Sequence, residues 1–195
     1  MDRVNSTETV GEVIESSTSE FLAESRELNE GPSFGTFVKT GPEPVIYGLV
    51  FNSTTHSLEP NRRPRAYGKT EAELRLEQPQ IFELLTTEFA VVVFGHLSER
   101  GPERVLPPQP PRIHNFVYTC NEAEVKALTV DGDFVRTILG RPALPADDLI
   151  IAAVRNAWHA RAFEMPYMVS LGKDLCRLVR DDYDRLSSIM RRISS

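Results

Sequence analysis

Four short β-rich segments, most of them marked by glycine, dominate the first half of this chain of 195 residues. They are residues 10–14, 35–39, 45–51 and 89–94. In residues 45–51 apolar side chains fall on both faces of the expected strand, with Tyr47 on one face and Ile46 on the other. Such a strand needs cover on both sides, which a barrel wrapped by helices provides. We therefore predict a small closed β-barrel at the N-terminus.

The hydrophobic spacing changes after residue 120 from that of strands to that of helices. Asn121 followed by Glu124 is typical of a helix start, and Gly140 with Pro142 predicts a helix end. The predicted helices cover residues 122–129, 133–139, 146–161 and 166–193, the last as one long helix. The fold class is thus mainly β at the N-terminus and helical at the C-terminus, α+β overall.

We expect three consecutive parts in the chain. A β-barrel takes residues 8–105, a proline-rich crossing segment takes 106–120, and a helical region takes 121–195. The prolines of the middle part predict an extended path over a surface. Ile113, Phe116, Val117 and Tyr118 are expected to be buried within it, because they are large and apolar.

Charge is unevenly distributed along the chain, whose formal net charge is −6. Residues 1–31 hold eight acidic residues against Arg3 and Arg26, so this segment alone carries −6. A mildly acidic protein is not drawn to DNA or anionic membranes by its overall charge. No apolar run approaches the ~20 residues of a membrane helix, and the first residues lack the apolar stretch of a signal peptide. We predict a cytoplasmic protein with no membrane contact.

Catalytic motifs are weak or missing. The sequence contains no GxxxxGK[ST] and no GxGxxG phosphate-binding motif. Residues 31–35 match GxSxG, but a turn precedes the serine where a nucleophile elbow needs a strand. The four histidines and two cysteines have no metal-ligand spacing; they are His56, His96, His114, His159, Cys120 and Cys176. We predict a non-enzyme with no catalytic residues, metal or cofactor.

One compact basic cluster lies in a loop of the barrel half. It consists of Arg62, Arg63 and Arg65, with Tyr67 beside them. Arginines can contact phosphates, and a tyrosine can stack on a base. The loop is predicted to contact nucleic acid or a protein partner; the alternative is a loop that is kept soluble by its charges.

An apolar stripe at helical spacing runs through the last predicted helix. Its members are Leu171, Leu175, Leu178, Leu186, Ile189 and Ile193. Two interpretations stay open. The stripe either packs on its own domain or forms a helical interface with a partner chain.

The order of the segments resembles the HAS barrel, the N-terminal barrel of HerA-type DNA-translocating ATPases and of ATP synthase ring subunits. The resemblance rests on residues 11–18, 35–38, 47–50, 106–111 and 121–128. In those relatives an ATPase core follows the barrel, whereas here only helices follow. The resemblance therefore implies assembly rather than hydrolysis.

Two functions follow as hypotheses. The first is a non-enzymatic assembly or protein-interaction module, whose partner is a second copy or an ATPase or nuclease of DNA processing. The alternative is a nucleic-acid-binding module that uses the basic loop.

Overall fold

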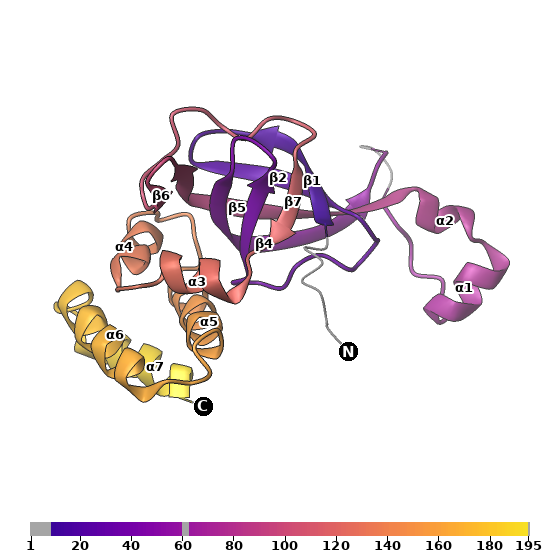
Figure 1. Cartoon of the computed structure of the whole chain (residues 1–195). Coiled ribbons are helices and arrows are strands. Elements are labelled where there is room, and N and C mark those ends of the chain that lie inside the picture. The colour runs from indigo at the N-terminus through magenta and orange to yellow at the C-terminus, as the bar shows by residue number, and fades with distance from the viewer. Residues whose placement is uncertain (1–8, 60–62, 195) are drawn as a thin grey trace, which may run out of the picture.

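The computed structural model describes residues 9–59 and 63–194. Seven strands form one antiparallel sheet whose pairings run in a ring (Figure 1). Their order is β2-β1-β7-β3-β4-β5-β6, and β2 also pairs with β5, so β6 lies outside the ring on β5. The strands are β1 (Thr9–Ser16), β2 (Glu20–Ser25), β3 (Phe37–Gly41), β4 (Ile46–Ser57), β5 (Leu85–Ser98), β6 (Gly101–Glu103) and β7 (Phe116–Thr119).

Apolar side chains from every strand of the ring fill its inside. They are Val13, Phe21, Ala23, Val38, Ile46, Val50, Phe89, Val91, Val93 and Val117. Two glycines make room for them. A Cβ on Gly48 would lie 2.3 Å from Val91 Cγ1, and one on Gly11 would lie 2.7 Å from the Phe89 ring. The glycines that mark these strands thus serve close packing inside the ring.

Five helices gather on one side of the ring (Figure 1). They are α3 (Glu122–Leu128), α4 (Asp133–Leu139), α5 (Ala146–His159), α6 (Met165–Leu178) and α7 (Tyr183–Ser194). Their apolar faces form a second core with the outer face of β3, β4 and β5, to which Phe37, Tyr47, Leu49, Val92 and Phe94 contribute. Residues 46–50 are consequently buried on both faces, as the sequence predicted.

Gly35, just before β3, lies directly against α5. Its φ is +78°, a conformation that favours glycine, and a Cβ there would lie 2.3 Å from Ala152 Cβ. Asn156 of the same helix donates from Nδ2 to the Gly35 carbonyl at 2.6 Å. Two ion pairs add to this seam: Lys39 pairs with Glu124 in α3, and Arg104 pairs with Asp131 between α3 and α4.

Arg161 holds the covering helices together from inside. Its guanidinium is buried and donates to the carbonyls of Lys126 (2.8 Å), Thr129 (3.0 Å) and Ala157 (3.0 Å), and to the Thr129 hydroxyl (2.9 Å). It also lies 3.9 Å from the centre of the Tyr167 ring. Carbonyls at the end of a helix carry partial negative charge, so they stabilise this cation without a carboxylate.

A second helical region leaves the ring on the opposite side. Residues 63–84, which we call the arm, join β4 to β5 and contain α1 (Glu71–Glu77) and α2 (Gln80–Glu83). In Figure 1 the arm extends away from both the ring and the other helices. Thr70 and Glu73 form a capping box that starts α1, but neither helix contains a buried residue.

Two expectations from the sequence were wrong. The crossing segment contains strand β7, which pairs with β1 and β3, so the sheet extends to residue 119. Val117 is fully buried there, but Ile113 and Phe116 are almost half exposed.

The predicted long helix over 166–193 is two helices, because Asp182 accepts a hydrogen bond from Arg185 N (2.9 Å) and caps a new helix. None of the described helices has the length and apolar character to cross a membrane.

Candidate interaction site

The predicted helical interface lies inside the molecule. Leu171, Leu175, Ile189 and Ile193 are at most 3% exposed and belong to the core between ring and helices. Leu178 and Leu186 pack against that core and are partly buried. Of the two interpretations of the stripe, packing on its own domain therefore holds. A partner cannot reach these buried side chains while α6 and α7 stay in place.

The basic loop is exposed at the base of the arm. Arg63, Arg65 and Tyr67 line a hollow of about 420 Å³ together with apolar side chains of the arm and β5. Arg62 lies outside the described residues. Within the described part of the chain Arg63 and Arg65 have no ion pair, whereas Lys69 pairs with Glu77. The loop thus offers two cations and an aromatic ring to a partner.

The outer face of β1, β2 and β7 is a surface that the sequence did not single out. Strand register places four side chains in one row across the sheet, namely Phe116, Glu12, Glu24 and Glu88 on β7, β1, β2 and β5. Like charges directly opposite each other destabilise a sheet. His114 Nδ1 contacts Glu12 at 2.5 Å and His56 Nε2 lies 3.6 Å from Glu88. Glu24, between them, has no ion-pair partner among the described residues.

Apolar and acidic side chains alternate on this face, which we call the open face. We define it by the outward side chains Glu12, Ile14, Glu15, Glu20, Leu22, Glu24 and Phe116. A hollow of about 620 Å³ lies on it, and Ile14, Glu24 and Phe116 are among the residues that line it. Phe116 is 48% exposed, although large apolar side chains are usually covered. The hollow thus places the apolar side chains of Ile14 and Phe116 beside Glu12 and Glu24, with Arg26 and His114 also in its lining.

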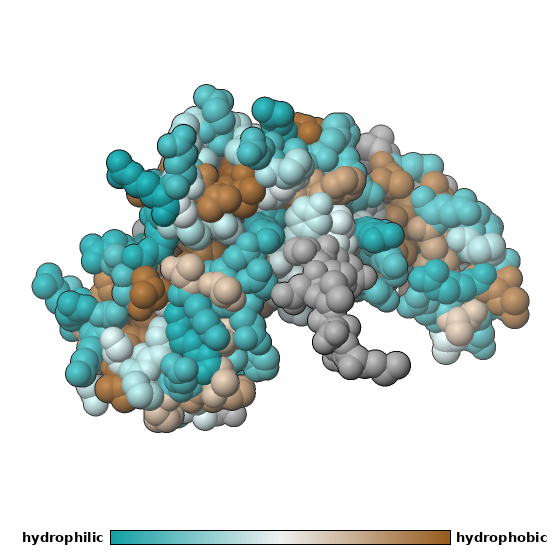
Figure 2. Space-filling model, viewed as in Figure 1, coloured by the Kyte–Doolittle hydropathy of each residue, from teal (hydrophilic) through white to brown (hydrophobic). Residues whose placement is uncertain are grey.

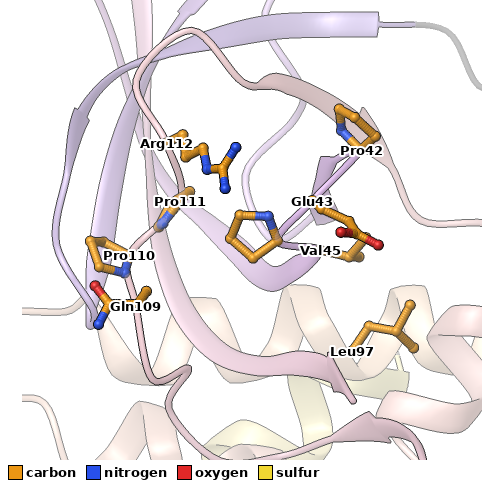
Figure 3. A pocket seen from close by; sticks show the side chains of 9 residues that line it. Pro42, Glu43, Val45, Leu97, Gln109, Pro110, Pro111 and Arg112 are labelled. Carbon is orange, nitrogen blue, oxygen red and sulfur yellow. The ribbon is translucent and has the colours of Figure 1, made fainter. Parts of the chain in front are cut away.

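A third hollow lies between the turn that joins β3 to β4 and the proline-rich crossing (Figure 3). It has a volume of about 770 Å³. Pro42, Glu43 and Val45 face Pro110, Pro111 and Arg112 across it, with Leu97 at its floor. Four prolines line it, together with Val45, Leu97 and the polar side chains of Glu43, Gln109 and Arg112.

One group of titratable side chains lies where α3 meets the ring. Lys39 pairs with Glu124 at 2.5 Å, and Tyr47 and Cys120 lie close to them. Burial raises the pKa of Tyr47 to about 12, with a smaller contribution from the Glu124 charge. Burial likewise raises the pKa of the Cys120 thiol. Both groups hold their protons at neutral pH, so neither is prepared to act as a base or nucleophile.

No three His, Cys, Asp or Glu side chains within residues 9–59 and 63–194 come together in a way that could hold a metal ion.

No protein-family model matches the chain, and no curated protein matches it either. The chemistry of its surfaces is therefore the basis for inference about function.

A sequence signal for the open face existed but was spread out. The excess of acidic residues in positions 1–31 predicted a negative region, but it did not show which side chains would share one face of the sheet. Glu12 and Glu24 become neighbours only through the antiparallel pairing of β1 and β2. Phe116 joins them through β7, a strand that was not predicted.

Proposed function

We propose that this chain is a non-enzymatic assembly module, built on a small closed barrel of the HAS type, that binds a protein subunit through its open face. One observation carries the proposal. Helices cover the outer face of β3, β4 and β5. On the open face, by contrast, Phe116 stays half exposed. Exposed apolar surface with a polar rim is typical of protein contact sites.

The nature of the hollows agrees with a binding role. The open face offers an apolar floor and several carboxylates, and the proline-lined hollow offers a rigid apolar surface. The hollow of the open face also contains His114, whose Nδ1 contacts Glu12 at 2.5 Å, and we infer that this pair serves contact with a protein rather than catalysis. We take the partner to be a second copy of the chain or an ATPase or nuclease of DNA processing, in the cytoplasm.

Site-specific photo-crosslinking in the native host tests the proposal. A photoreactive phenylalanine analogue replaces Phe116 or Glu20 on the open face, and Lys173 or Ser187 on the exposed side of the helices serves as the control. We expect covalent protein adducts from the first pair and none from the second. Equal adducts from all four positions, or none from the open face, would contradict the proposal.

The basic loop supports a second candidate, a nucleic-acid-binding module. The supporting observation is that Arg63 and Arg65 are exposed without an ion pair among the described residues, beside a Tyr67 that is 45% exposed. Binding of a fluorescein-labelled single-stranded oligonucleotide should then weaken steeply with added salt. An Arg63→Ala, Arg65→Ala variant should bind more weakly than wild type. An oligonucleotide affinity that changes neither with salt nor with the two substitutions would eliminate this candidate.

A further inference from the structure

We propose that the open face receives the arm of a second copy of this chain. The inference rests on the proposed function to the extent that both require the open face to be a contact surface. It adds the partner and the part of the partner that binds. Three features of the described residues lead to it: the exposure of the arm, the charges of the two surfaces, and their separate places in the fold.

The arm is a helical segment without a core of its own. Helices shorter than ~12–15 residues are marginal in water unless they are packed, and α1 and α2 have 7 and 4 residues with none buried. Leu76 on α1 is 86% exposed. Figure 2 shows hydrophobic surface at the outer end of the arm, with hydrophilic surface around it. Such an arm gains stability when its apolar side chains are covered by a partner.

Local interactions nevertheless fix the shape of the arm. A capping box holds the start of α1, and Lys69 and Arg75 pair with glutamates of the same helix. Arg75 also lies 4.4 Å from the centre of the Phe82 ring, which connects α1 to α2. A preorganised arm loses less conformational entropy on docking than a disordered one would.

The charges of the arm loop and the open face are complementary. The open face carries four glutamates, Glu12, Glu15, Glu20 and Glu24, against Arg26 and His114 in the lining of its hollow. The basic loop at the base of the arm contains Arg63 and Arg65, which have no ion pair among the described residues. A guanidinium between Glu12 and Glu24 would remove the repulsion within their row, and arginine binds carboxylates with two parallel hydrogen bonds. Tyr67 and Leu76 would then contact Ile14 and Phe116 in the hollow of the open face.

The two surfaces belong to different parts of the molecule. The arm leaves the ring where β4 ends and β5 begins, and it extends away from the ring (Figure 1). Each copy therefore offers one arm and one open face, so the contact joins unlike surfaces of two copies. Contacts of this type form a closed ring or a reciprocal pair where the rotation between copies closes, and an open filament where it does not.

Charge reversal with light scattering tests the inference. The arm variant carries Arg63→Glu and Arg65→Glu, and the face variant carries Glu20→Lys and Glu24→Lys. We expect wild type to have a multiple of the 22.0 kDa chain mass, and each variant alone to have the mass of a single chain. An equimolar mixture of the two variants should regain the wild-type mass, since the acidic arm of one fits the basic face of the other. All four residues are exposed, so the fold should persist, as circular dichroism would verify.

A matched control reverses two exposed arginines elsewhere, Arg136→Glu and Arg191→Glu, and should keep the wild-type mass. The inference is overturned if wild type is a single chain at all concentrations, or if the mixture of arm and face variants stays monomeric. Photo-crosslinks from Phe116 to a different protein would then leave the proposed function standing without this partner. Loss of oligonucleotide binding in the arm variant, with an unchanged mass, would also overturn it and favour nucleic acid as the ligand of the loop.

Discussion

The ring has two walls that differ in what lies outside them. Five helices cover the wall made by β3, β4 and β5, where Tyr47, Leu49 and Phe94 are at most 5% exposed. The other wall, made by β1, β2 and β7, turns Glu12, Leu22 and Phe116 outward, and no helix within residues 9–59 and 63–194 covers them. Both walls contribute apolar side chains to the core inside the ring. The covered wall stabilises the fold, and the open wall is the one that we propose for contacts.

The largest expected difference comes from one substitution made on both walls. Phe37→Ala on the covered wall should lower the free energy of unfolding by ~3–5 kcal/mol, because it removes a buried ring that packs against Phe94 and Phe134. Phe116→Ala on the open wall should change it by less than ~1 kcal/mol. Urea unfolding followed by circular dichroism measures both. Equal losses would mean that the two walls contribute alike.

Arg161→Met should destabilise the cover by ~2–4 kcal/mol, since it removes the donors for buried carbonyls and leaves them unpaired. The native contacts at stake are those to Lys126, Thr129 and Ala157. Relative to wild type, the substitution should accelerate hydrogen exchange more in α3 and α5 than in β1 and β2. Arg136→Met, an exposed position on α4, is the control and should have little effect. Unchanged protection in the helices would contradict the role assigned to Arg161.

The seam between ring and helices is tested by two glycines with left-handed backbone. Gly35→Ala places a methyl group against Ala152 and should cost ~1–3 kcal/mol from overpacking, in addition to the backbone strain. Gly68 in the arm has a φ of +68° and open space around it, so Gly68→Ala should show the strain alone, ~1 kcal/mol. Thermal unfolding distinguishes them. Equal shifts would show that contact with α5 is unimportant.

The smallest expected effect concerns the pair that links the α3–α4 turn to the segment after β6. Hydrogen bonds from Arg104 lower the pKa of Asp131. A lowered pKa stabilises the fold at pH values above the ordinary value of 3.8, and this contribution is lost as pH falls below it. Asp131→Asn should therefore lower stability by less than ~1 kcal/mol at neutral pH, because the pair is partly exposed. Measured at decreasing pH, the difference from wild type should shrink; a constant difference would exclude the charge as its cause.

Much of the fold could be predicted from local patterns. The apolar side chains on both faces of residues 45–51 predicted a strand buried on both sides, and the spacing after residue 120 predicted helices. The break at Asp182 was missed because the apolar stripe continues across it, so periodicity alone cannot separate one helix from two that share a core. Strand β7 was missed because it has only four residues and follows a proline-rich segment.

The candidate site divides in the same way. The exposed arginines of the arm are visible in the sequence as a cluster, since they lie within a few residues of one another. The open face is not, because its row of side chains comes from β7, β1, β2 and β5. The stripe of leucines and isoleucines in α6 and α7 was clear as a pattern, but the pattern could not say whether its own ring or a partner covers it.

The sequence by itself determined most of the strands and helices, the strands that are marked by glycine, and the acidity of the N-terminal region. These properties depend on residues close together in the chain, where periodicity, backbone freedom and charge act locally. The tertiary structure decided which wall of the ring the helices cover, and hence which apolar side chains remain outside. That choice depends on pairings and packing between residues far apart in the chain, such as Glu12 with Phe116 and Gly35 with Ala152, which no local pattern contains.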